Sequence, residues 1–149
     1  MREANQQAAR TSIPRIRQSP YYPRDRSSNV IIRIKIFTNN EWFFPVHFKG
    51  HPNVPGVLML EAMAQMLTVA ITTLPGNKGK VTHAISHEVK FKKEIHPGQK
   101  LIIESKVISW KRGLCNGLAK GFVNKDLVCE ANMVITIPQI LSKYFPKTT

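Results

Sequence analysis

The chain has little of what would cross-link a protein, anchor it in a membrane or bind a metal. Only two cysteines occur among 149 residues, too few for a disulfide framework or a four-cysteine zinc site. No apolar run reaches about 18 residues without a charge, which argues against a membrane-spanning helix. The first residues lack the apolar core of about 7–15 residues that a secretory signal needs. These absences predict a reduced cytoplasmic protein without a membrane span.

Acidic side chains are scarce as well. The chain has 9 aspartates and glutamates against 22 lysines and arginines, a net charge of +13. Such a field attracts an acidic partner, which leaves nucleic acid, an anionic membrane and an acidic protein as classes. Charge alone does not choose among them, and a basic surface that serves only solubility is a further explanation.

Residues 1–28 differ in composition from residues 29–149. They hold six arginines, two acidic residues and three prolines, with almost no apolar periodicity. We expect a poorly ordered basic N-terminal arm, followed by one domain over residues 29–140 and a tail over 141–149. The arginine-rich, acid-poor arm is also similar in composition to an organellar transit peptide, which would place the protein in an organellar stroma.

The rest of the chain predicts an α+β fold. Apolar and polar residues alternate over 29–36, which indicates a half-buried strand with Arg33 and Lys35 on one face and four apolar residues on the other: Val30, Ile32, Ile34 and Ile36. Residues 55–74 are apolar nearly all round and predict a long buried helix, capped by Asn53. Four further apolar runs, at 83–93, 100–110, 113–124 and 127–137, predict four consecutive antiparallel strands. The simplest arrangement is one helix wrapped by a curved sheet.

The predicted helix carries one polar stripe. Its members are spaced four, three and four residues apart and therefore share a face: Glu61, Gln65, Thr68 and Thr72. The stripe either faces solvent or a partner subunit, or Glu61 takes part in chemistry. A carboxylate buried among apolar side chains is costly unless it is paired, and burial favours its protonated form. Glu61 is therefore a candidate catalytic acid.

Two more candidates precede or open this helix. His47 lies in the aromatic and proline-rich loop, where histidine serves either as a general base or as a structural hydrogen-bonding group. Gly56 stands at the helix start, where free backbone N–H groups can hold a developing oxyanion, or where a tight entry simply requires glycine. The remaining histidines have no spacing typical of a zinc site, so we expect no metal.

Residues 40–65 read NEWFFPVHFKGHPNVPGVLMLEAMAQ. This run resembles the signature of the FabZ/FabA-type 3-hydroxyacyl-[acyl-carrier-protein] dehydratases, roughly FF-x-x-HF-x-G-x-P-x-x-PG-V-x-x-x-EA-x-AQ. A looser resemblance continues through Phe91-Lys92-Lys93 and Pro97-Gly98 to about residue 137. The family's usual apolar N-terminal segment is missing. Val46 replaces a small residue and Lys49 a proline, which bears on the shape of the site and the acyl length it accepts.

The resemblance implies a hotdog fold and a homodimer at minimum, with a trimer of dimers as a larger alternative. It implies composite sites, with His47 as catalytic base from one protomer and Glu61 as catalytic acid from the other. Further site positions are implied by their place in the signature: Gly56 and Val57 at the oxyanion, Phe91 at the substrate, and Gln65 in support of Glu61. Glutamate at position 61 is typical of the FabZ branch.

The implied reaction is dehydration of a (3R)-hydroxyacyl thioester to a trans-2-enoyl thioester, in fatty-acid or related lipid or polyketide synthesis. It needs no cofactor. The implied partner is acyl carrier protein, and its acidity gives the basic surface a role, with Lys90, Lys92 and Lys93 as the expected docking residues.

Two alternatives remain open. A hotdog acyl thioesterase would use Glu61 on water, although such enzymes generally lack the HF…PG arrangement. A non-catalytic acyl-thioester-binding protein or nucleic-acid-binding regulator would suit the charge, but has no reason to keep both His47 and Glu61. We therefore expect no nucleic-acid partner.

Overall fold

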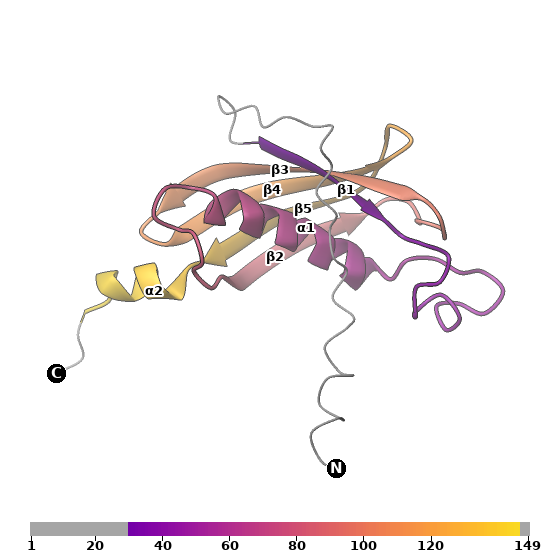
Figure 1. The fold of residues 1–149 in the computed structure, drawn as a ribbon, viewed down its shortest axis with the longest axis horizontal. Helices are drawn as coiled ribbons and strands as arrows, with labels where there is room; N and C mark the ends of the chain where they lie inside the picture. Colours follow the sequence, from indigo (N-terminus) through magenta and orange to yellow (C-terminus); the bar gives the residue numbers. More distant parts are fainter. Residues whose placement is uncertain (1–29, 147–149) are drawn as a thin grey trace, which may run out of the picture.

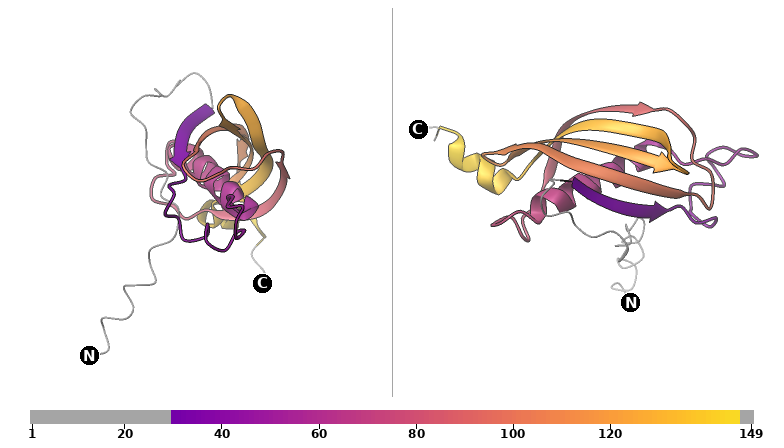
Figure 2. Two further views of the ribbon diagram at one scale, coloured as in Figure 1. Left: turned by 90° about the vertical axis from the view of Figure 1, so that its right-hand side faces the viewer. Right: turned by 90° about the horizontal axis from the view of Figure 1, so that it is seen from above.

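A long helix lies across one face of an antiparallel sheet in the computed structural model, which describes residues 30–146 (Figure 1). The elements in chain order are β1 Val30–Ile36, α1 Gly56–Thr72, β2 His83–Phe91, β3 Lys100–Lys111, β4 Leu114–Val123, β5 Asp126–Thr136, α2 Pro138–Leu141 and a 3₁₀ turn Ser142–Tyr144. The sheet curves around α1, as the end view in Figure 2 shows. The predicted α+β layout is confirmed. The basic arm lies outside the described residues, and α2 crosses the expected start of the tail.

The four strands that follow α1 along the chain all pair antiparallel, but the sheet order is β1-β3-β4-β5-β2, so β2 does not neighbour β3. β1 occupies the outer edge of β3, where Ile36 pairs with Lys100. β2 therefore pairs with the free edge of β5, from His83 opposite Thr136 to Phe91 opposite Cys129. The connection from β2 to β3 must cross from one side of the sheet to the other. This crossing, residues 92–99, passes beside the start of α1.

The orientation predicted for β1 is wrong. Arg33 and Lys35 lie on the buried face, opposite Ile103 and Leu101, whereas Ile36 is exposed. A strand shows its two faces in the sequence but not which face the helix covers, and here the register decides. The Lys35 ammonium reaches the Glu41 carboxylate at 3.2 Å, which compensates its burial.

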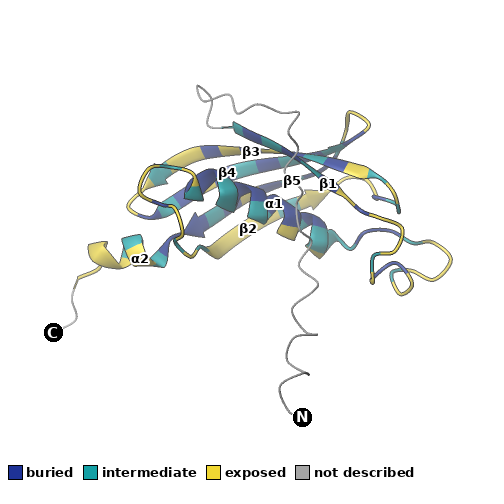
Figure 3. Cartoon of the chain, viewed as in Figure 1, coloured by how far each residue is buried: buried dark blue, intermediate teal, exposed yellow. Residues whose placement is uncertain are grey.

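The helix buries one face instead of its whole circumference. Seven residues face the sheet: Met59, Ala62, Met63, Met66, Leu67, Ala70 and Ile71. Leu67 packs directly over Gly117 of β4, where a Cβ would collide with its side chain. Figure 3 shows the buried band along α1 and the central strands, with β2 exposed along its length. The predicted cap by Asn53 is wrong, because Pro55 precedes the helix and no side chain caps it.

Cys115 and Cys129 are free and buried within the sheet core. Burial raises the pKa of each thiol to about 11, so both stay protonated near neutral pH. Within residues 30–146, no helix is long and apolar enough to span a bilayer.

Candidate active site

His47 is fixed by the backbone of its own loop. Its N–H donates to the Phe43 carbonyl at 2.9 Å, and its Nδ1 lies 3.1 Å from the Asn53 carbonyl oxygen. A carbonyl oxygen only accepts, so Nδ1 must carry the proton. The neutral ring then presents the lone pair of Nε2 as an acceptor. This tautomer is the one that a general base working through Nε2 requires.

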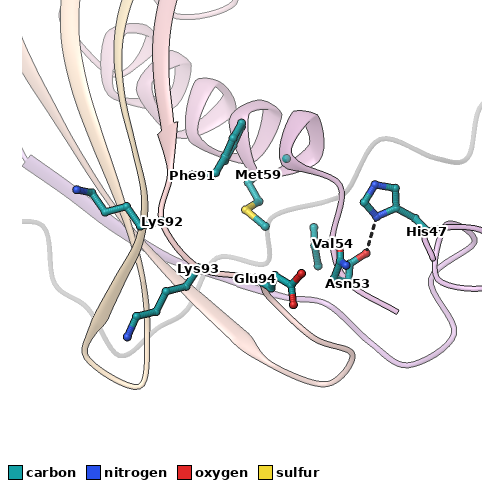
Figure 4. A pocket seen from close by; sticks show the side chains of 9 residues that line it. His47, Asn53, Val54, Met59, Phe91, Lys92, Lys93 and Glu94 are labelled. Atoms are coloured by element: carbon teal, nitrogen blue, oxygen red, sulfur yellow. Dashed lines mark hydrogen bonds between the residues drawn. The ribbon is translucent and has the colours of Figure 1, made fainter. Parts of the chain in front are cut away.

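His47 opens onto a pocket of about 280 Å³ at the start of α1 (Figure 4). The lining comes from the His47 loop, the first turn of α1, and the end of β2 with the crossing after it: His47, Asn53, Val54, Gly56, Met59, Phe91, Lys92, Lys93 and Glu94. The structure thus brings together His47, Gly56, Phe91, Lys92 and Lys93 of the residues expected from sequence.

Gly56 and Phe91 are in intimate contact. A Cβ built on Gly56 would lie 2.9 Å from two atoms of the Phe91 ring, closer than side chains approach. Glycine at position 56 therefore lets the ring lie against the helix start. The first N–H groups of a helix have no partner within it, and the positive end of the helix dipole lies there. The pocket lining at Gly56 is therefore a helix start, where free N–H groups can donate to a carbonyl oxygen.

Glu61 lies elsewhere on the chain surface. Its Oε1 accepts from Gln65 Nε2 at 2.8 Å, and both residues line a second pocket of about 450 Å³ together with Thr68, Thr82 and Ala84. Glu61 is exposed within one chain, which agrees with the alternative that the polar stripe faces solvent or a partner subunit. His47 and Glu61 do not share a pocket in a single protomer.

The three lysines expected to dock the carrier protein separate into two groups. Lys92 and Lys93 line the His47 pocket, where Lys92 lies 3.5 Å from the Glu130 carboxylate and Lys93 lies 2.9 Å from that of Asp126. Lys90 is not part of the pocket lining. Val57 is 71% exposed and is likewise outside the lining.

Sequence reasoning missed Asn53, Val54, Met59 and Glu94 as pocket residues. Asn53 acts through its main chain, which no side-chain pattern reveals. Glu94 directly follows the Phe-Lys-Lys run, and only that proximity could have indicated it.

The structural neighbours define the class of fold. A phenylacetic acid degradation-related protein of Ralstonia eutropha superimposes with a TM-score of 0.64 at 15% identity, covering 78% of this chain and 82% of that one. The PaaI protein of Escherichia coli gives 0.59 at 11% identity, over 74% and 73% of the two chains. The chain therefore has the hotdog fold.

The sequence comparisons define the family within that class. Residues 26–132 match the model of the FabA-like domain. The 3-hydroxyacyl-[acyl-carrier-protein] dehydratase FabZ of Desulforamulus reducens is 37% identical over 110 residues, 73% of this chain and 78% of that protein. FabZ of Caldicellulosiruptor saccharolyticus is 43% identical over 105 residues, 70% and 75% of the two chains. The chain belongs to the FabZ-type dehydratase family.

Proposed function

We propose that this protein dehydrates (3R)-hydroxyacyl-[acyl-carrier-protein] to trans-2-enoyl-[acyl-carrier-protein]. The observation that carries the proposal is His47, held with Nδ1 protonated in a pocket that the helix start at Gly56 also lines. The relatives named above are called 3-hydroxyacyl-[acyl-carrier-protein] dehydratases, and each matches this chain over 70% or more of its length. Their names and the pocket geometry support the same chemistry.

Each residue has a distinct role in the proposed mechanism. Nε2 of His47 takes a proton from C2 of the substrate, while N–H groups at Gly56 and Val57 stabilise the negative charge that develops on the thioester oxygen. Glu61 gives a proton to the departing C3 hydroxyl, with Gln65 orienting its carboxyl group. The C2–H and C3–O bonds break, the C2=C3 bond forms, and water leaves. The reverse sequence hydrates an enoyl thioester.

The proposed mechanism requires Glu61 from a second chain. Glu61 lies in a separate pocket of its own protomer, together with Thr82, which precedes β2, and Ala84, which lies in its first residues. β2 is an edge strand whose residues are almost all exposed, so it offers unpaired main-chain groups to another strand. A homodimer joined along β2 would carry the polar stripe toward the partner's His47 pocket. A trimer of such dimers is the larger assembly we propose.

The proposal is tested by following enoyl absorbance with 3-hydroxyacyl and enoyl carrier-protein thioesters of several lengths. We expect His47→Ala and Glu61→Gln each to lower turnover at least about 100-fold, the usual scale for a lost acid or base. Glu104→Gln, which alters an exposed carboxylate on β3, is the matched control and should keep full turnover. Release of the carrier thiol without enoyl formation would indicate a thioesterase instead.

Docking of the acidic carrier is proposed to involve Lys90, Lys92 and Lys93. Reversal of Lys92 and Lys93 to glutamate should raise the apparent KM for carrier-bound substrate, most strongly at low salt, because exposed charges act mainly on association. A short thioester without the carrier should be turned over nearly normally. Reversal of Lys106 and Lys111 on β3 changes the net charge equally outside the pocket. An equal loss on both substrates, or with both variants, would contradict specific docking.

A further inference from the structure

A cluster of three titratable side chains lies beside the His47 pocket. Glu94, which lines the pocket, accepts a hydrogen bond on Oε2 from His51 Nε2 at 2.8 Å. The same oxygen lies 3.7 Å from Nε2 of His96. The two imidazole rings meet edge to face with centroids 5.6 Å apart. The Glu94 carboxylate thus faces His51, from the loop before α1, and His96, from the crossing between β2 and β3.

The cluster is part of a continuous join between these connections. Nδ1 of His96 lies 3.2 Å from the Pro52 carbonyl oxygen and therefore donates to it. The Val54 N–H donates to the Ile95 carbonyl at 2.8 Å, and both of these side chains are buried. Residues 94–96 therefore hold positions 51, 52 and 54 of the loop that precedes α1.

The position left between them, Asn53, is the one that holds His47. Its carbonyl accepts from His47 Nδ1 at 3.1 Å, and its N–H donates to the His47 carbonyl at 2.9 Å. The ring of His47 therefore takes its orientation from a residue whose two neighbours are fixed by the crossing. Figure 4 shows Asn53 between His47 and the Glu94 side of the pocket.

The crossing itself is anchored on the sheet. Lys92 N–H donates to the Val128 carbonyl at 2.7 Å, and Gly98 N–H donates to the Phe37 carbonyl at 2.7 Å. Phe37 N–H returns a bond to the Gln99 carbonyl at 3.2 Å. Main-chain hydrogen bonds to neighbouring strands therefore hold the chain on both sides of residues 94–96, so these residues can fix the position of the loop.

We propose that Glu94 is a positioning residue for His47, acting through His51 and, more weakly, His96. The inference rests on the proposed function for its kinetic readout only. Glu94 and His51 are both more than half exposed, so their contact adds little to global stability. Its effect is local, because a displacement of a catalytic base by a fraction of an ångström lowers turnover without altering the fold.

The test compares Glu94→Ala and Glu94→Gln with Glu104→Ala as the control for removal of an exposed carboxylate. Glu94→Ala should lower kcat about 3- to 10-fold with KM nearly unchanged, since a misplaced base affects the chemical step. Glu94→Gln keeps an oxygen that accepts from His51 and should retain most of the turnover. Urea unfolding should be the same for the wild type and all three variants.

Two further measurements separate positioning from other roles. The ¹⁵N resonances of the His47 ring should show protonated Nδ1 in the wild type and a shift toward mixed tautomers in Glu94→Ala. Glu94→Ala combined with His51→Ala should lose no more turnover than Glu94→Ala alone, because the two act through one contact. Multiplicative losses, or an unchanged His47 spectrum, would overturn the proposal. If the wild type had no dehydratase activity while Glu94→Ala still shifted the His47 ring resonances, the proposed function would be refuted and the positioning role supported.

Discussion

The Phe91 ring fills the space that a side chain at position 56 would need, so these two residues constrain each other. A methyl group at Gly56 would meet the ring at 2.9 Å. We expect Gly56→Ala to lower turnover at least about 10-fold by displacing the ring or the helix start that bears the oxyanion donors. Stability should change by only about 1 kcal/mol, because alanine favours the helix while the contact is overpacked.

The contact itself is tested by a double-mutant cycle. Phe91→Ala removes the ring, so Gly56→Ala should be less destabilising in that background when unfolding free energies are compared. An identical cost in both backgrounds would show that position 56 is restricted by something other than the ring.

At this scale the sequence indicates residues that act through their side chains. The signature around His47 and Gly56, and the later Phe-Lys-Lys run, indicate residues on both sides of the pocket but not its full lining. Asn53 contacts His47 through its main-chain groups. Glu94 contacts His51, which is distant in the sequence, and His96, which is two residues further along. Such contacts depend on the folded loops and leave no local pattern.

Among the elements, the packing of α1 on β4 depends on Gly117. The Leu67 side chain, fully buried, lies where a Cβ at position 117 would be. We expect Gly117→Ala to destabilise the fold by about 1–3 kcal/mol, the usual range for overpacking. Urea unfolding would measure this loss of stability.

A second variant tests the cause of that loss. Leu67→Ala removes the opposing side chain, so adding Gly117→Ala to it should cost much less than in the wild type. Unchanged cost would place the strain within β4 and not at the helix.

The elements also show where sequence patterns stop being informative. The type and rough extent of each strand and of α1 can be predicted from periodicity, with β2 ending at Phe91 instead of 93. The buried face of β1 cannot, because alternation is symmetric until a partner covers one side. Nor can the place of β2, because pairing with β5 depends on which edge β1 has already taken.

For the whole molecule, the separation of His47 and Glu61 into two pockets leads to a prediction about the proposed dimer. If a complete site takes one residue from each chain, two inactive variants must complement each other. A dimer of His47→Ala with Glu61→Gln has one site with both residues intact and one with neither. After random exchange of equal amounts, we expect about one quarter of wild-type turnover, from half of the dimers with one working site each.

The matched control uses two residues of the same pocket. Gly56→Val introduces a side chain against the Phe91 ring and should be inactive. Positions 56 and 47 line the same pocket of one chain. Mixing Gly56→Val with His47→Ala leaves every site defective, so turnover should stay at background. Subunit exchange is verified by mass spectrometry of differently tagged chains. Recovery in the control pair, or none in the test pair after verified exchange, would contradict a site shared between Glu61 of one chain and His47 of the other.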